Sequence, residues 1–289
     1  MKLPAYLGLL LTTLLVTACV EEADELPAFV SVDAFELVTG QGEGAATSDI
    51  REVWAFVGGN FLGAYDLPAR IPLYESGTTE VELRAGVHKD GRSVTPEPYE
   101  FYAPVVRTLD LEPGMTTALG TLPLRYADGI RFGFIEDFED GEAEVFTVEA
   151  VGEAPILAQG QIVRSGNFAG TYSLTDSIPL VEFQSEQVFR ELLRTRQYVY
   201  LELDYRSDVP TQTGVVPVNG PVGVTPLFDA GFRGRDTWTK LYIDLTPVIG
   251  QLESQRATDY RVGLTSLILE EGQTSGTGYL DNLKLLYFD

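Results

Sequence analysis

The chain has 289 residues, with 43 acidic and 20 basic side chains that give a formal net charge of −23. Nucleic-acid binders need excess Lys and Arg to neutralise phosphates, so this charge excludes a general nucleic-acid partner. A single Cys excludes a disulfide framework, and 11% aromatic residues with 29 Gly are typical of a folded, turn-rich β protein.

The chain begins with the pattern of an export signal. Met1 and Lys2 give a short basic start, and the apolar run LGLLLTTLLV occupies residues 7–16. This run has the length of a signal-peptide core and is too short to span a bilayer comfortably. We therefore expect residues 1–18 to be removed on export.

Residues Val16-Thr17-Ala18-Cys19 resemble the lipobox of bacterial lipoproteins. The resemblance implies cleavage before Cys19, a diacylglycerol on its thiol and an acyl chain such as palmitate on its amine. Several acyl chains anchor a protein stably where one does not. The alternative is an ordinary signal peptide followed by a chance cysteine, but a lone exported thiol without a disulfide partner favours lipidation.

An acidic stretch, VEEADE at residues 20–25, follows within a predicted tether over 19–27. It resembles the signal with which some gram-negative bacteria export lipoproteins to the outer face of the outer membrane. Short blocks of like charge are also typical of solvated tethers, and both properties can hold together. The resemblance predicts a lipid-anchored protein of the outer membrane that faces the cell exterior.

Residues 28–126 show short alternating runs bounded by turn residues, which are typical of β-sandwiches. EVWAFV at 52–57 is apolar on both faces, and Gly58-Gly59-Asn60 leads into a returning strand, which predicts a hairpin. About seven strands in this length match an immunoglobulin-like sandwich. The predicted strands cover 29–38, 52–57, 61–65, 79–84, one or two within 99–111, and 116–124.

This block also resembles the small N-terminal domains of exported lipoproteins with the pattern V-W-x-F-V-x-G-x-x-L-G-x-Y-x-L-P, here residues 53–68. The pattern describes a strand, a tight hairpin and a second strand, so we expect Trp54 in the core rather than on a ligand platform. The single histidine, His88, is expected in an exposed turn. No nucleophile motif surrounds it, so it indicates no catalytic site.

Residues 128–289 continue the strand pattern, and YVYLELDY at 198–205 alternates strictly. One short helix is predicted over 186–194, with Ser185 as its N-cap and apolar residues on one face. Another is predicted to begin at Thr246-Pro247. The predicted strands cover 131–138, 144–151, 171–174, 198–205, 240–245, 260–269 and 279–288.

Three stretches of this second block resemble strands of carbohydrate-binding modules and their galactose-binding-like relatives. They are FIEDFEDG at 134–141, WTKLYIDLT at 238–246 and GYLDNLKL at 278–285. The resemblance implies a jelly-roll β-sandwich, so the expected fold is all-β, with an immunoglobulin-like sandwich followed by a jelly roll. Fold alone does not fix the ligand.

The same resemblance implies a structural calcium ion between the opening strand and the last strand. The matching residues are Glu136, Asp137 and Asp281, with Glu139 and Asp140 as alternatives. Calcium prefers several carboxylate and backbone oxygens. The alternative is a solvated acidic turn together with an Asp that accepts hydrogen bonds from backbone amides.

A glycan site needs flat aromatic faces and polar groups that hold the sugar hydroxyls. Trp238 begins a strand, and Tyr200 and Tyr242 share their strand faces with acidic residues. These three residues are the predicted ligand-binding platform, on faces that we expect to be exposed. The alternative is that they are ordinary half-buried tyrosines of a sheet.

The sequence as a whole favours a non-catalytic, membrane-anchored surface lipoprotein that binds a ligand, with glycan as the expected class. The alternative is a structural or accessory subunit of an outer-membrane protein assembly, which uses the jelly roll as a protein–protein module; the scarcity of Trp favours it. A glycoside hydrolase is a minor alternative, because carboxylates are abundant but a catalytic pair needs a spacing that a sequence does not show.

Overall fold

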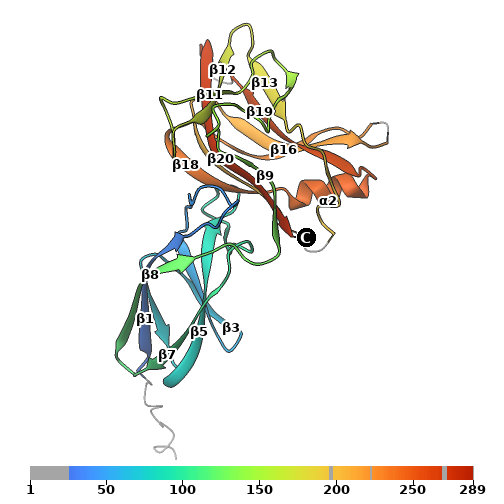
Figure 1. The fold of residues 1–289 in the computed structure, drawn as a ribbon. Coiled ribbons are helices and arrows are strands. Elements are labelled where there is room, and N and C mark those ends of the chain that lie inside the picture. Colours follow the sequence, from blue (N-terminus) through green and yellow to red (C-terminus); the bar gives the residue numbers. More distant parts are fainter. Residues whose placement is uncertain (1–25, 195–197, 222, 269–271, 289) are drawn as a thin grey trace, which may run out of the picture.

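The computed structural model describes residues 26–194, 198–221, 223–268 and 272–288. The strands form four sheets, which confirms the predicted all-β sandwich class. Strands β1–β8 form a first sandwich at one end of an elongated molecule, and β9–β20 form a second sandwich at the other end (Figure 1). The predicted signal peptide, Cys19 and the acidic stretch lie outside the described residues.

The first sandwich packs a three-stranded sheet, β4-β1-β8, against a sheet with the order β3-β2-β5-β6 in which β7 also pairs with β5. Alternate side chains of both sheets, such as Val32 of β1 and Leu83 of β5, fill the core between them. The strands are β1 (Ala28–Leu37), β2 (Glu52–Val57), β3 (Asn60–Asp66), β4 (Ala69–Leu73), β5 (Gly77–His88), β6 (Pro96–Pro98), β7 (Val105–Leu111) and β8 (Thr116–Leu124).

The predicted hairpin forms between β2 and β3. Gly58 and Gly59 adopt φ values of 56° and 79°, the left-handed region that a tight hairpin turn requires and that glycine enters without strain. The expectation that Trp54 is a core residue is wrong. Strand alternation sends Val53 inward and Trp54 outward, where its ring stacks on Phe61 with ring centroids 5.0 Å apart.

The second sandwich also has two sheets. One has the order β10-β13-β19-β16-β17 with β14 beside β19, and the other has the order β11-β12-β20-β15-β18 with β9 beside β20. The strands are β9 (Ile130–Glu136), β10 (Val148–Val151), β11 (Leu157–Gln159), β12 (Ala169–Thr175), β13 (Leu180–Gln184), β14 (Phe189–Arg190), β15 (Val199–Ser207), β16 (Thr211–Asn219), β17 (Leu227–Phe232), β18 (Arg235–Asp244), β19 (Asp259–Leu267) and β20 (Ser275–Phe288).

Helix α2 (Thr246–Ser254) begins at Thr246 with a proline in its first turn, as predicted. The helix predicted over 186–194 is wrong. The short strand β14 pairs Phe189 with Tyr260 of β19, and Ser185 accepts a hydrogen bond from Val262 N instead of capping a helix. A helix of this length is only marginally stable by itself. Burial of the apolar residues in the sheet core therefore decides the conformation. No helix in the described part of the chain is long and apolar enough to cross a bilayer.

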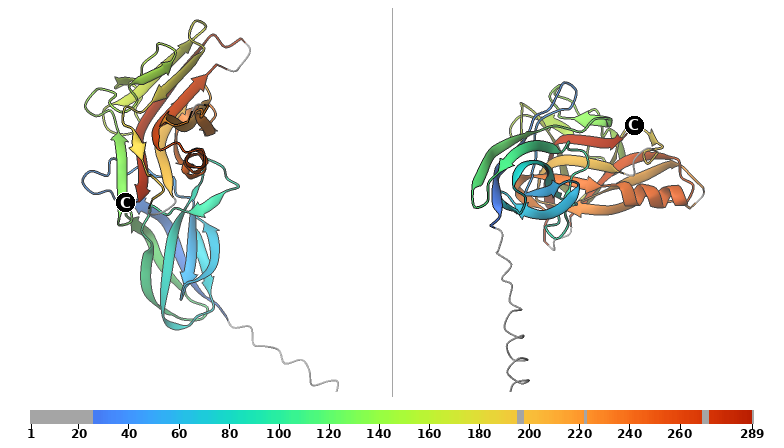
Figure 2. Two further views of the ribbon diagram at one scale, coloured as in Figure 1. Left: turned by 90° about the vertical axis from the view of Figure 1, so that its right-hand side faces the viewer. Right: turned by 90° about the horizontal axis from the view of Figure 1, so that it is seen from below.

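The two sandwiches share one hydrophobic core where they meet. Tyr200, Tyr242 and Phe288 of the second sandwich belong to the same buried cluster as Phe101 of the first. The rings of Phe101 and Phe288 stack with centroids 4.9 Å apart. Strand β20 therefore ends against the first sandwich, as Figures 1 and 2 show, while its first residues lie at the far end of the molecule.

Candidate binding site at the open end of a sheet face

One face of the sheet that contains β15, β18 and β20 carries a long row of polar side chains. On β15 the odd-numbered residues from Val199 to Tyr205 enter the core of the second sandwich. The even-numbered residues from Tyr200 to Arg206 point to the opposite face, as strand alternation requires. At one end of this face the side chains are buried beneath the first sandwich, and at the other end they are accessible to solvent.

The part of the face nearest the first sandwich is sealed by aromatic residues. Tyr200 is 3% exposed and its hydroxyl donates to Glu97 at 2.6 Å, while Tyr242 is 1% exposed and accepts from Asp49 N at 3.0 Å. The expectation that these tyrosines form an exposed platform is therefore wrong. The acidic neighbours that suggested exposure are themselves buried, because the first sandwich covers this part of the face.

The middle of the face holds a buried cluster of charged groups, formed by Glu202, Asp204, Lys240 and Lys284. The side chains of Glu202 and Lys240 are 0% and 1% exposed, and Lys240 Nζ lies 3.2 Å from Glu202 Oε2. Thr47, from the loop between β1 and β2, donates to Asp204 at 2.6 Å. A loop of the first sandwich thus closes over charges on the sheet of the second.

Tyrosines of the first sandwich complete this buried cluster. Tyr99 and Tyr126 donate to the two oxygens of Glu202 at 2.9 and 3.0 Å, and Lys284 Nζ donates to Tyr126 and to the Ala45 carbonyl. Burial lowers the pKa of Lys284 to about 8, although the charge of Glu202 opposes that shift. Because Glu202 is fully covered, a substrate has no access to it.

His88 lies at the edge of the seam between the sandwiches. It is the last residue of β5 rather than part of an exposed turn, and its Nε2 lies 2.7 Å from Glu52 Oε1. The expectation of an exposed turn is therefore wrong. A buried carboxylate holds the ring in place.

The carboxylates predicted to hold calcium are occupied by backbone donors. Glu136 accepts hydrogen bonds from the backbone N–H groups of Phe138, Glu144 and Val145 at 2.7–3.1 Å. Asp137 accepts from Glu139 N at 3.3 Å. Glu136 thus ties the turn after β9 to its strand.

Asp281 is used in the same way. It accepts from the backbone N–H groups of Arg164, Ser165 and Asn282 at 2.8–3.2 Å, and burial raises its pKa to about 7 against the effect of these donors. Within the residues that the structure describes, no three His, Cys, Asp or Glu side chains converge as metal ligands. Glu136, Asp137 and Asp281 therefore do not fit a calcium ion in this arrangement.

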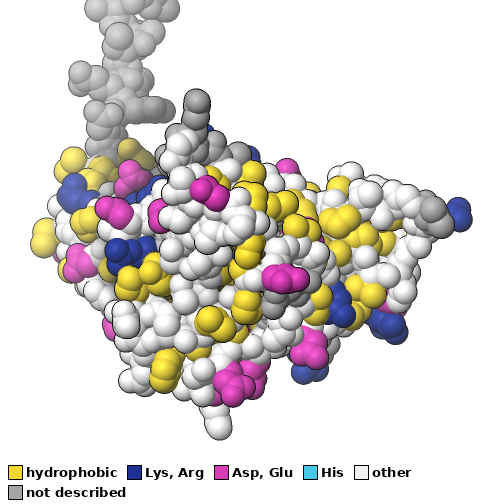
Figure 3. Space-filling view, turned by 90° about the horizontal axis from the view of Figure 1, so that it is seen from above, with side chains coloured by type: hydrophobic (Ala, Val, Ile, Leu, Met, Phe, Trp, Pro, Cys, Tyr) yellow, Lys and Arg dark blue, Asp and Glu magenta, His cyan; other side chains and the backbone are white. Residues whose placement is uncertain are grey.

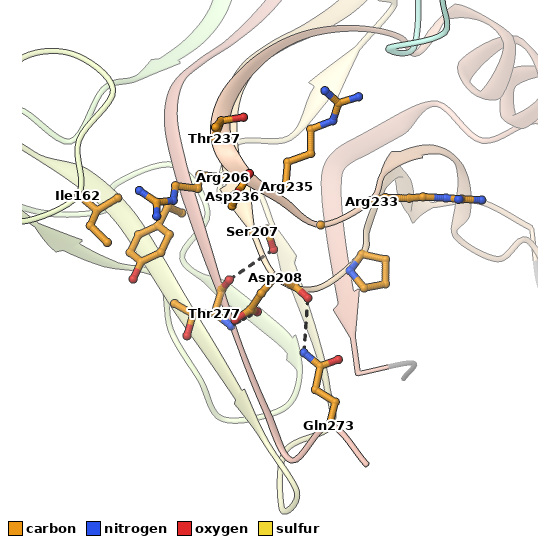
Figure 4. A pocket seen from close by; sticks show the side chains of 13 residues that line it. Ile162, Arg206, Ser207, Asp208, Arg233, Arg235, Asp236, Thr237, Gln273 and Thr277 are labelled. Carbon is orange, nitrogen blue, oxygen red and sulfur yellow. Dashed lines mark hydrogen bonds between the residues drawn. The ribbon is translucent and has the colours of Figure 1, made fainter. Parts of the chain in front are cut away.

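The far end of the face is open and forms a cavity of about 1160 Å³. Arg206 of β15 and Tyr279 of β20 are direct cross-strand partners, so their half-buried side chains lie next to each other. The cavity is lined by Ile162, Arg206, Ser207, Asp208, Pro210, Arg233, Gly234, Arg235, Asp236, Thr237, Gln273, Thr277 and Tyr279 (Figure 4).

One polar atom in the wall of this cavity has no hydrogen-bond partner within the described segments. Gln273 Oε1 is buried and accepts no hydrogen bond from the described residues, although Gln273 Nε2 donates to the Asp208 carbonyl at 3.4 Å. Ser207 Oγ, in contrast, donates to the backbone carbonyls of Val209 and Thr277. Because Gln273 Oε1 is buried, a ligand that enters the cavity has no direct access to it.

Only one of the three predicted platform residues lies near this open end. Trp238 is half-buried, follows the lining residues Asp236 and Thr237, and by strand alternation points to the same face as Lys240. Tyr200 and Tyr242 lie at the sealed end instead. Arg206 and Tyr279 are not among the residues predicted from the sequence. The sequence feature that could have indicated this site is the presence of three arginines, at 206, 233 and 235, in a strongly acidic chain.

No family model matches the chain, and no curated protein matches it. Solved structures with similar folds include a carbohydrate-binding module of the β-sandwich superfamily, 14% identical with a TM-score of 0.37 over 81% of this chain and 84% of that one. A xylan-binding domain from Paenibacillus barcinonensis is 11% identical, with a TM-score of 0.37 over 56% of this chain and 97% of that one. A family 29 carbohydrate-binding module is 9% identical, with a TM-score of 0.34 over 55% and 91%. Likeness at this level assigns no ligand to this chain.

Proposed function

We propose that this protein is a non-catalytic glycan-binding module held at the outer membrane by a lipid on Cys19. The observation that carries the proposal is the open cavity, where Tyr279 lies beside Arg206. Sugars are bound by aromatic rings together with a few polar groups that hold their hydroxyls. Tyr279 supplies the ring, and the guanidinium of Arg206 supplies hydrogen-bond donors.

The position of the cavity supports a role on the cell surface. Strand β1 begins at the end of the first sandwich that points away from the second (Figures 1 and 2). The cavity is lined by residues of the second sandwich. A lipid attached upstream of Ala28 would hold the second sandwich, with its cavity, farther from the membrane than the first.

A glycan array probed with the detergent-purified protein tests the binding role. We expect binding to at least one glycan, and Tyr279→Ala should weaken it about tenfold. Tyr74→Ala is the matched control, because Tyr74 is a 69% exposed tyrosine of the first sandwich. A blank array would refute the proposal, and glycan hydrolysis by the pure protein would refute its non-catalytic part.

The anchor is tested separately. We expect mass spectrometry to find the processed N-terminus at Cys19 with a diacylglycerol and an acyl chain. Cys19→Ala should move the protein from the membrane fraction to the soluble fraction. Antibody labelling of intact cells checks the orientation, and a signal that requires a broken envelope would exclude surface display.

A second candidate is an accessory subunit of an outer-membrane protein assembly. The observation that favours it is an aromatic patch on the outer side of β2 and β3, where Trp54 and Phe56 contact the 52% exposed Phe61. Exposed apolar patches mark interaction surfaces. Under this candidate, Phe61→Ser removes cross-linking to one defined membrane protein in cells while Tyr279→Ala leaves it intact.

A further inference from the structure

We infer that the ligand of the cavity is an acidic polysaccharide, a sugar polymer with carboxylate groups, which Arg206, Arg233 and Arg235 bind. The inference rests on the proposed glycan-binding function and adds the class of glycan. The cavity concentrates positive charge in a chain that has little of it. Three of its lining residues are arginines, although the whole chain has only 20 Lys and Arg against 43 Asp and Glu.

The positive surface continues beyond this cavity. A second cavity of about 450 Å³ shares Arg233 and Arg235 with the first and adds Arg51 and Arg92. Arg51 is neutralised locally by Asp49, which lies 2.9 Å from it. The turn that carries Arg233 and Arg235 therefore stands between two adjoining hollows, and each guanidinium is accessible to a ligand that runs across both.

The arginines of the first cavity have no carboxylate partner in the part of the chain that the structure describes. Among the described residues, Arg206 and Arg233 form no ion pair and no hydrogen bond, and Arg235 interacts with the neutral hydroxyl of Tyr205. Elsewhere in the structure, arginines such as Arg164 and Arg190 are paired with Asp204 and Asp259. Guanidinium groups that form no ion pair with the described residues are available to an anion from outside.

The two acids of the cavity do not cancel this charge. Asp208 accepts a hydrogen bond from Thr277 N at 2.6 Å, which holds it against the start of β20. Asp236 lies in β18 between Arg235 and Thr237, so it remains as the second negative group. Among the described lining residues, three positive groups thus stand against two negative ones, in contrast to the protein as a whole.

The arrangement of the arginines suits a polymer rather than a single small acid. Figure 4 shows Arg206 on one side of the cavity and Arg233 on the other, with Arg235 between them. Arginine presents a planar fork that binds a carboxylate through two parallel hydrogen bonds. Separated forks match carboxylates that repeat along a chain, and Tyr279 offers a ring to the sugar next to Arg206.

The net charge of the protein opposes an anionic ligand at long range but not at contact. At physiological ionic strength the Debye length is about 8 Å, so distant carboxylates are screened while contact pairs persist. Figure 3 shows acidic side chains dispersed over the face that is seen from above, with Lys and Arg side chains interspersed among them. Contact with the arginines of the cavity, rather than the screened charge of the rest of the surface, therefore decides where the polymer binds.

The test uses polygalacturonate and the same polymer with its carboxyl groups methyl-esterified, measured against the full protein by titration calorimetry at about 0.15 M salt. We expect polygalacturonate to bind and the ester to bind at least about tenfold more weakly, because the ester keeps the sugar chain and removes the charge. Equal binding of both polymers would overturn the inference and leave the proposed function standing. If neither binds and the glycan array is blank, both fall. If only a sulfated polymer without carboxylates, such as dextran sulfate, binds, the carboxylate class is wrong.

A set of variants places the binding in the cavity. Arg206→Gln, Arg233→Gln and Arg235→Gln together should weaken polygalacturonate binding by at least about tenfold. The matched control replaces three arginines of the first sandwich that line neither cavity, the exposed Arg70 and Arg125 and the half-buried Arg107, by Gln, which changes the net charge equally. Equal loss in both triple variants would show a nonspecific charge effect and overturn the assignment.

Discussion

Lys240 and Glu202 form an ion pair in which the two side chains are 1% and 0% exposed and Nζ lies 3.2 Å from Oε2. The pair lies where the loop between β1 and β2 covers the sheet of the second sandwich. Two charges taken out of water are costly unless each keeps its partners. Here Tyr99, Tyr126 and Thr47 of the first sandwich supply the remaining hydrogen bonds. The charges of the second sandwich are thus stabilised by groups of the first.

Removing one member of the pair should destabilise the fold strongly. We expect Lys240→Met to lower the free energy of unfolding by about 3–5 kcal/mol, because it leaves the Glu202 carboxylate buried without its cation. Urea denaturation followed by tryptophan fluorescence measures this. The control is Glu191→Ala, which breaks the exposed pair with Arg194 and should cost less than about 1 kcal/mol. Equal losses in the two variants would contradict the buried cluster.

The hydroxyl of Tyr126 should stabilise the fold, and a variant that keeps the ring measures its contribution. Tyr126→Phe removes the hydrogen bond to Glu202 and the acceptor of Lys284, so we expect a loss of about 1–3 kcal/mol. Tyr74→Phe should be neutral, since Tyr74 is 69% exposed. If urea denaturation finds no difference between the two variants, the contact between Tyr126 and Glu202 does not hold the seam.

Two buried groups should give the stability a minimum near pH 7–8. The folded pKa of Asp281, about 7, lies above the ordinary 3.8, so the folded state binds more protons between these values and the free energy of unfolding falls as pH rises through them. The folded pKa of Lys284, about 8, lies below the ordinary 10.5, so the unfolded chain binds more protons there and the free energy of unfolding rises again.

Variants isolate these two contributions from the other titrating groups. Urea denaturation from pH 4 to 10 is compared between the wild type and Asp281→Asn, and between the wild type and Lys284→Met. The first difference curve should change between pH 4 and 7, and the second above pH 8. Flat difference curves would show that neither group is perturbed in the folded protein.

Calcium should leave the stability unchanged. The oxygens of Glu136 and Asp281 already accept backbone hydrogen bonds, so a cation would have to displace them. We expect the melting temperature to differ by less than about 1 °C between calcium and EDTA, because a ligand that binds only the folded state would raise it. A rise of several degrees with calcium would re-establish the metal site predicted from the sequence.

The sequence predicts the strands that have clear local signals. The β2–β3 hairpin follows from two glycines between apolar runs, and β15 and β20 follow from their alternating or apolar patterns. Strand β16 is not predicted, because TQTGVVPVN contains a glycine and a proline and does not alternate. It forms because β19 and β17 pair with it on its two sides. The residues of β16 alone do not show this pairing.

The candidate site is harder to predict for the same reason. The alternation of β15 correctly places Tyr200 with Glu202 and Asp204, but these polar neighbours indicate a solvated face when only the local sequence is known. The first sandwich covers that face with Tyr99 and Tyr126, and no local pattern reveals such a cover. The open end of the face, with Arg206 and Tyr279, depends on the pairing of strands that are distant in the chain.

The path of β20 has a mechanical consequence. The strand runs from Tyr279 beside the cavity to Phe288, which stacks on Phe101 of the first sandwich. Force applied to a polymer held in the cavity would be transmitted along this strand and through the first sandwich to β1. The hydrogen bonds between β15 and β20 would then be loaded in parallel, as in shear, rather than opened one after another. The sheet of the second sandwich is thus built to resist tension along β15 and β20.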